Sequence, residues 1–147
     1  MNRTFLCIDL KTFFASVECV ERGLDPFAVN LVVADPSRGR GALCLAVTPK
    51  LKAQGVHNRC RIFEIPEHIS YITALPRMNL YMRYSADIYG IYLKYVSHED
   101  IHVYSIDEAF LDVSNYLQLY GIDAKNLTKK ILEDIYITTG ITATAGI

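Results

Sequence analysis

The sequence predicts an α+β fold of the split βαβ type, in which an antiparallel sheet carries helices on one face and a small α/β lobe is inserted. Outside residues 22–75, the apolar patterns follow the order strand–helix, helix, β-hairpin, helix, strand, which is close to the split βαβ order. Residues 27–75 add further apolar runs and a short helix, and look like the inserted lobe. At 147 residues, the chain is long enough for one core with such an insertion.

In the first half of the chain, short apolar runs alternate with helical spacing and with turns that contain Gly or Pro. Phe13, Val17 and Val20 follow at i, i+4 and i+7, which indicates a helix. Pro49 is suited to the first position of a second, short helix that Gly55 would end. The strands are expected at residues 4–10, 30–35 and 42–47, and the helices at residues 12–21 and 49–54.

The second half begins with the longest predicted helix, residues 77–96, along which four tyrosines and Ile88 recur every three or four positions. This stripe is interpreted as core packing of amphipathic rings, with a stacking platform as the alternative. A β-hairpin, a helix that Asp123 would cap and a last strand are then expected, at residues 101–106 with 109–113, 123–136 and 141–147.

The composition is that of an ordinary globular protein, with 51% apolar and 21% charged residues and a net charge of -1. No apolar run approaches the ~20 residues of a membrane span, and the N-terminus lacks the pattern of a signal peptide. We therefore expect a cytoplasmic protein with no membrane partner. The four cysteines are widely spaced without a CxxC pair, which favours buried or half-buried thiols over a zinc site.

One stretch, residues 36–63, carries six basic residues and no acidic one. It has two interpretations: a solvated basic face, or a surface that contacts phosphate groups. The basic residues are Arg38, Arg40, Lys50, Lys52, Arg59 and Arg61.

Adjacent carboxylates at Asp107 and Glu108 interrupt the predicted hairpin. If the hairpin pairs with the first strand, Asp9 lies beside them, and three converging carboxylates would need divalent cations. Such oxygen ligands suit Mg2+ or Mn2+, and two ions would support in-line phosphoryl transfer. From spacing alone the alternative stays open that the pair is a solvent-exposed turn and Asp9 a strand end.

Two long motifs, residues 7–18 (CIDLKTFFASVE) and 104–114 (YSIDEAFLDVS), resemble the two acidic motifs of Y-family, or translesion, DNA polymerases, most closely of the UmuC-like branch. Residues 40–56 occupy the place of the fingers segment. The resemblance implies a ferredoxin-like palm at residues 1–26 and 76–147, with fingers at residues 27–75. It also implies a chain truncated before the thumb and little finger.

The resemblance also implies residue roles. Asp9, Asp107 and Glu108 resemble the catalytic metal ligands, which the backbone carbonyl of Leu10 would complete around two Mg2+ ions, with Mn2+ as an alternative. Phe14 falls on the steric-gate position that excludes a ribose 2′-hydroxyl, with a plain core role as the alternative. The nucleotide-binding set implied by the family comprises Phe13, Phe14, Thr48 and Lys52, with Phe13 as the core-facing ring of its pair.

Two positions depart from the family pattern. Pro49 stands where many members carry a tyrosine that touches the triphosphate, and Thr48 is expected to substitute for it. Lys11 replaces an acidic or polar residue after the first aspartate. The implied partners are primer–template DNA and a deoxynucleoside triphosphate, together with a sliding clamp and accessory proteins.

Translesion DNA synthesis, as part of DNA repair and the SOS response, is therefore the function that the sequence predicts. Two alternatives stay open: a non-catalytic UmuC-like accessory protein, and a nucleotidyl cyclase with a similar palm. We expect this chain by itself to be nearly inactive.

Overall fold

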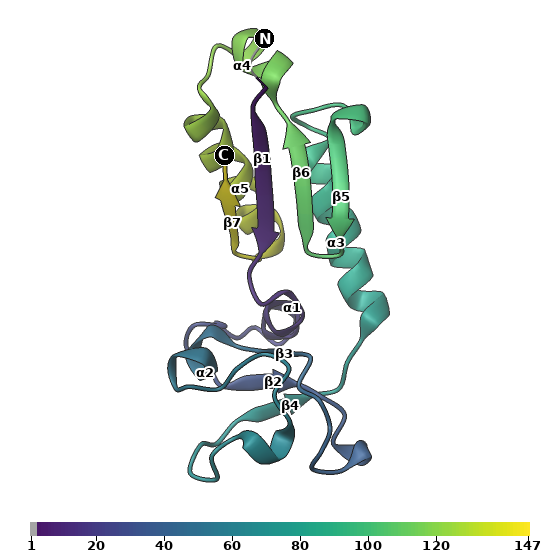
Figure 1. Cartoon of the computed structure of the whole chain (residues 1–147), viewed down its shortest axis with the longest axis vertical. Helices are drawn as coiled ribbons and strands as arrows, with labels where there is room; N and C mark the ends of the chain where they lie inside the picture. Colours follow the sequence, from purple (N-terminus) through teal and green to yellow (C-terminus); the bar gives the residue numbers. More distant parts are fainter. Residues whose placement is uncertain (1–2) are drawn as a thin grey trace. The chain divides into compact units, whose positions relative to one another are not determined.

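The computed structural model describes residues 3–147, which divide into two compact units (Figure 1). The first unit comprises the residues up to Lys11 together with Met82–Ile147, and the second comprises Thr12–Tyr81. Each unit has its own sheet.

The first unit is built on a four-stranded sheet in the order β5-β6-β1-β7, in which all neighbouring strands are antiparallel. Helices α3 and α5 lie on one face of this sheet (Figure 1). The strands are β1 (Phe5–Leu10), β5 (Ile101–Ser105), β6 (Glu108–Asp112) and β7 (Ala143–Gly146). The helices are α3 (Met78–Tyr92), α4 (Ser114–Tyr120), α5 (Ala124–Thr139) and a short 3-10 turn, η3 (His98–Asp100), and the residues of α3 up to Tyr81 belong to the second unit.

The side chains of β1 alternate between the helix-covered face and the open face of the sheet. Leu6, Ile8 and Leu10 are buried, whereas Phe5 and Asp9 are exposed. This period of two is what a strand with one covered face requires. It fixes the register, because a slip of one residue would expose the apolar set. Asp9 therefore projects from the open face.

The second unit is built on a three-stranded sheet in the order β3-β2-β4, with β2 antiparallel to β3 and parallel to β4. Its elements are α1 (Phe13–Glu21), β2 (Leu31–Val33), η1 (Pro36–Arg38), β3 (Ala46–Val47), α2 (Pro49–Ala53), η2 (Ile62–Glu64) and β4 (Ile72–Ala74).

The central strand of this unit, β2, is buried along its whole length, because both faces of its sheet are covered. Val32 belongs to an apolar cluster with Leu51 of α2 and Ile65. Side chains alternate along a strand, so Leu31 and Val33 face the opposite side, where α1 packs against β2. Such a doubly covered strand reads as a continuous apolar run in the sequence.

The predicted fold class is confirmed, and the differences in detail have local causes. The strand expected at residues 42–47 is shorter, because residues 42–44 pair instead with the segment at Cys60–Ile62: the amide of Ile62 donates to Ala42 and the amide of Cys44 to Cys60. Helix α4 was not expected. It directly follows β6, and Gly121 ends it in a left-handed conformation with φ 62°.

The helix expected at residues 77–96, α3, ends at Tyr92, four residues before the expected boundary, and the chain continues in a turn. At 15 residues it is shorter than α5, which has 16, so it is not the longest helix as predicted. Three members of its predicted stripe, Tyr81, Ile88 and Tyr92, are buried, so the interpretation as core packing is confirmed for them. The boundaries of the two compact units differ from those of the predicted palm and fingers segments. Helix α1 was expected in the palm segment, but it packs against β2 and β3 and so belongs to the second unit. The assignment of the domains stays a prediction.

All four cysteines are free, two of them buried and two half-buried, as expected. Within residues 3–147, no helix has both the length and the apolar character needed to cross a membrane.

Candidate active site

Asp9 and Glu108 lie directly opposite each other in the ladder between β1 and β6. Directly opposed residues of antiparallel strands project to the same face of a sheet, with their Cβ atoms about 5 Å apart. Asp9 is exposed and Glu108 is half-buried. The prediction that the hairpin pairs with the first strand is therefore confirmed, and this pairing places Asp9 beside Glu108.

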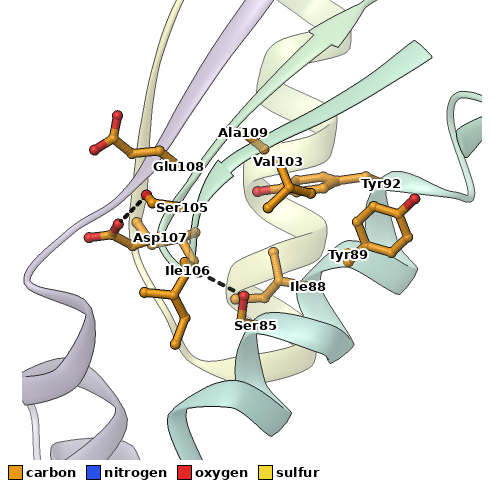
Figure 2. A pocket seen from close by; sticks show the side chains of 11 residues that line it. Ser85, Ile88, Tyr89, Tyr92, Val103, Ser105, Ile106, Asp107, Glu108 and Ala109 are labelled. Atoms are coloured by element: carbon orange, nitrogen blue, oxygen red, sulfur yellow. Dashed lines mark hydrogen bonds between the residues drawn. The ribbon is translucent and has the colours of Figure 1, made fainter. Parts of the chain in front are cut away.

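Asp107 is held beside this pair by the backbone of the hairpin turn. Its carbonyl oxygen accepts a hydrogen bond of 2.8 Å from the amide of Leu10, which couples the end of β1 to the turn. The Ser105 hydroxyl donates to the Asp107 carboxylate at 2.9 Å. The side chains of Asp107 and Glu108 extend to the same side of the hairpin, away from Ser85 and Ile88 of α3 (Figure 2).

The rear of the turn is fixed to α3. The Ser85 hydroxyl donates a hydrogen bond of 2.7 Å to the carbonyl oxygen of Ile106 (Figure 2). A cavity of about 20 Å³ adjoins this bond, between the hairpin and the helix residues Ile88 and Tyr92. Ser85 and Ser105 were not singled out from the sequence, because a lone serine carries no recognisable signal there. They hold the carboxylate-bearing turn from both sides.

The donor set fits a hard divalent cation, since carboxylate and carbonyl oxygens are the ligands that Mg2+ and Mn2+ prefer. In residues 3–147, however, no three Asp, Glu, His or Cys side chains are gathered closely enough to hold a metal ion as they stand. The backbone brings Asp9, Asp107 and Glu108 to one end of the sheet, while the Asp107 carboxylate is oriented by Ser105. Rotation of these side chains would be part of binding an ion.

In the second unit, the two adjacent phenylalanines have different environments. Phe13 is 3% exposed and belongs to the core, whereas Phe14 is half-buried. The ring of Phe14 stacks on Tyr81 with a centroid distance of 4.6 Å and an interplanar angle of 17°. Only Phe14 of this pair has a ring surface left for a ligand.

Tyr81 is in turn bound to a buried carboxylate, that of Glu18, through a hydrogen bond of 2.7 Å from the tyrosine hydroxyl. Arg77 binds the same carboxylate at 2.6 Å and 3.0 Å. Burial by itself raises the pKa of Glu18, but the hydrogen bonds from Arg77 and Tyr81 outweigh it and leave that pKa below its ordinary value. The Tyr81 pKa is raised, by burial and by its bond to Glu18.

The cluster of Phe14, Glu18, Arg77 and Tyr81 was not predicted from the sequence, although the spacing of these residues contains a signal. Phe14 and Glu18 are four residues apart on α1, and Arg77 and Tyr81 are four residues apart at the start of α3. Residues at this spacing lie on the same face of a helix. A glutamate within the otherwise apolar run of α1 could therefore have prompted a search for an arginine partner.

The residue before these phenylalanines, Thr12, has a left-handed backbone with φ 41° and ψ 52°. A β-branched residue rarely adopts this region, at a cost on the order of 1–3 kcal/mol. Its hydroxyl lies 3.1 Å from that of Ser16, and its carbonyl accepts from the Ser16 amide. Strained backbone of this kind concentrates at functional sites.

The two predicted triphosphate contacts, Thr48 just before the short helix α2 and Lys52 within it, have different environments. Thr48 is fully buried: its hydroxyl donates to the carbonyl of Val29 at 2.8 Å and accepts from the amide of Leu31 at 3.1 Å. Both hydrogen bonds of the Thr48 hydroxyl are therefore made to the backbone of its own unit. Nothing in this arrangement supports a contact between Thr48 and a nucleotide. Lys52 is exposed. Pro49 begins the helix, as predicted.

A matching family model covers residues 8–147 and is described as the impB/mucB/samB family. The putative UV-damage repair protein UvrX of Bacillus subtilis is 34% identical over 147 residues, which are 99% of this chain and 34% of that protein. The DNA repair protein homolog YozK of Bacillus subtilis is 38% identical over 107 residues, which are 72% of this chain and 93% of that protein.

Among solved structures, a Y-family DNA polymerase chimera of Dbh and Dpo4 matches with a TM-score of 0.82 and 29% identity, over 97% of this chain and 41% of the chimera. The fold and the pair of acidic motifs thus define a domain of the Y-family DNA polymerases. The chain belongs to the impB/mucB/samB family. It spans about a third of the length of UvrX, with which it aligns almost throughout.

Proposed function

We propose that this chain forms the catalytic palm and fingers portion of a translesion DNA polymerase, which extends a primer past damaged template bases. The observation that carries the proposal is the pairing of Asp9 with Glu108, next to Asp107, in a chain of this family. Like charges directly opposite each other on adjacent strands destabilise a sheet. A metal cation bound between the two carboxylates would offset this repulsion.

In this proposal Asp9, Asp107 and Glu108, with the backbone carbonyl of Leu10, hold two Mg2+ ions, for which Mn2+ can substitute. When bound, such ions stabilise charge on the transferring phosphoryl group and activate the attacking hydroxyl. Ser105 orients the Asp107 carboxylate, and the bond from Ser85 to Ile106 keeps the turn in place. The backbone of the hairpin is thereby fixed, and rotation of the carboxylate side chains would complete the ligand set.

Substrate selection is assigned to the second unit. Phe14 presents a ring that is fixed on one side by Tyr81 and that would close the space required by a ribose 2′-hydroxyl. Lys52 is exposed on α2 and would contact the triphosphate as a point charge. The proposed partners are primer–template DNA and a deoxynucleoside triphosphate. Contacts with a sliding clamp or accessory proteins, a cytoplasmic location and a part in the SOS response stay predictions from the resemblance.

A non-catalytic role in DNA repair is the second candidate, because the names of UvrX and YozK mention repair without synthesis. Primer extension separates the two. The complete gene product should extend a primer opposite intact and damaged templates with Mg2+ present, and Asp107→Asn should abolish extension while retaining binding to primer–template DNA. DNA binding without extension by the unaltered protein would favour the accessory role. Formation of cyclic nucleotides without a primer would favour the cyclase.

A further inference from the structure

Glu18 is 0% exposed, although it carries an ionised carboxylate within an apolar helix. Its two oxygens are saturated by donors. Oε1 accepts from Arg77 at 2.6 Å and more weakly from Arg22 at 3.5 Å, while Oε2 accepts from Arg77 at 3.0 Å and from Tyr81 at 2.7 Å. The two-point contact from Arg77 fixes the plane of the carboxylate as well as its position.

The position of this carboxylate is transmitted to the ring of Phe14. The Tyr81 hydroxyl is bound to Oε2 of Glu18, and the Tyr81 ring stacks on Phe14 with an interplanar angle of only 17°. Phe14 itself has no polar atom that could hold its side chain. Its closest ring contact is the stack on Tyr81, whereas the Phe13 ring lies farther off at 6.0 Å, so Tyr81 has the larger part in orienting it. The orientation of Tyr81 is in turn set by Glu18 and Arg77.

We propose that the ion pair between the buried Glu18 carboxylate and the half-exposed Arg77 guanidinium is a positioning element for sugar selection, which holds Tyr81 and thereby the Phe14 ring against the deoxyribose of the incoming nucleotide. The inference rests on the proposed role of Phe14 as the steric gate. A repulsive element discriminates only while it cannot move aside, because a mobile ring would let a ribose enter at little cost. Rigid support from a second layer of residues provides that resistance.

A role in stability alone explains the ion pair less well. Desolvation of the Glu18 carboxylate offsets much of its attraction to the half-exposed Arg77, and apolar replacements of buried ion pairs are often neutral or stabilising. This property supplies a clean test. The double variant Glu18→Leu/Arg77→Met removes both charges together, so no buried charge is left unpaired, while it deprives the Tyr81 hydroxyl of its acceptor.

The experiment measures single-nucleotide insertion by the complete gene product, with a deoxyribonucleotide and with the matching ribonucleotide. The readout is the ratio of the two kcat/KM values. In the double variant this ratio should fall about tenfold, which corresponds to about 1.4 kcal/mol of lost discrimination. Tyr81→Leu should behave like the double variant, and Phe14→Ala should lower the ratio further. Tyr81→Phe keeps the stacked ring but removes the hydroxyl that binds Glu18, so it should lower the ratio about as much as the double variant.

Val32→Ala serves as the matched control, because it truncates a buried residue of the apolar cluster in the same unit. It should lower the melting temperature and leave the ratio unchanged. If Phe14→Ala lowers the ratio and the double variant does not, the positioning role is overturned while the proposed gate stands. If Phe14→Ala leaves the ratio unchanged, the gate itself is wrong, and the inference falls with it.

Discussion

Asp9 of β1 is the direct cross-strand partner of Glu108 of β6, at the end of the sheet where the hairpin turns. Two carboxylates in this relation repel each other, and the strand register allows neither of them to move to the other face. A bound divalent cation would offset this repulsion, as the proposed function requires.

Replacing one member of the pair should separate stability from function. Glu108→Gln removes the repulsion and should stabilise the metal-free protein by about 0.2–1 kcal/mol. Added Mg2+ should raise the melting temperature of the unaltered protein and leave that of the variant nearly unchanged. Thermal unfolding with EDTA and with Mg2+ measures both effects. Equal responses to Mg2+ in the two proteins would contradict the metal site at Glu108.

Phe14→Ala should increase ribonucleotide insertion far more than it changes deoxyribonucleotide insertion, since the substitution removes a repulsive contact. Single-nucleotide insertion by the complete gene product provides the measurement. Phe13→Leu is a suitable control, because Phe13 is buried and should affect stability without altering sugar choice. If Phe14→Ala left the preference for deoxyribonucleotides over ribonucleotides unchanged, Phe14 would have only a packing role in the core.

Lys52→Ala should weaken nucleotide use by about 1.5–3 kcal/mol, the loss of one charged contact. The effect should appear mainly as a higher KM for the triphosphate. Arg38→Ala is the matched control in the same basic stretch, since the Arg38 side chain is exposed and only 3.8 Å from the Asp35 carboxylate, at the limit of an ion pair. Its charge is screened by salt, so the change should be small. Similar losses in the two variants would indicate a general basic face.

Glu18 should make the stability of the protein depend on pH in the acidic range. Its pKa is below the ordinary value of 4.5, so its contribution is complete above about pH 4.5 and is lost as the pH falls through the lowered value. Denaturant unfolding between pH 7 and pH 3.5 measures this loss. The variant Glu18→Leu/Arg77→Met should lose less stability over that range. Parallel curves would show that the carboxylate has no such linkage.

The buried thiols should resist alkylation in the folded protein. Burial raises the pKa of Cys19 to about 11, and burial with the neighbouring Cys60 raises the pKa of Cys44 to about 12. At pH 8 the thiolate fraction of Cys19 should be about a hundredfold lower than in the unfolded chain. Mass spectrometry after timed alkylation checks this. Rapid labelling of Cys19 or Cys44 would mean that the second unit opens readily.

The sequence alone was sufficient for the fold class and for the partners of Asp9. The short, mostly apolar run at residues 4–10 indicated a strand that ends near Asp9, and the interruption of the hairpin at Asp107 and Glu108 placed carboxylates at its tip. These are local signals, since they depend on the apolar character of a strand and on the chemistry of a turn. The motifs around them supplied the family.

Only the tertiary structure revealed the contact between Glu18 and Arg77. Glu18 and Arg77 are 59 residues apart in the chain. No local sequence pattern predicts that this arginine binds this buried carboxylate. The same holds for Thr48, whose hydroxyl was expected at a nucleotide and instead binds the backbone at Val29 and Leu31. The periodicity of apolar residues in the sequence predicts which face of a helix or strand is buried. Which polar groups contact one another beneath that face depends on how the elements pack, because buried donors and acceptors need hydrogen-bond partners.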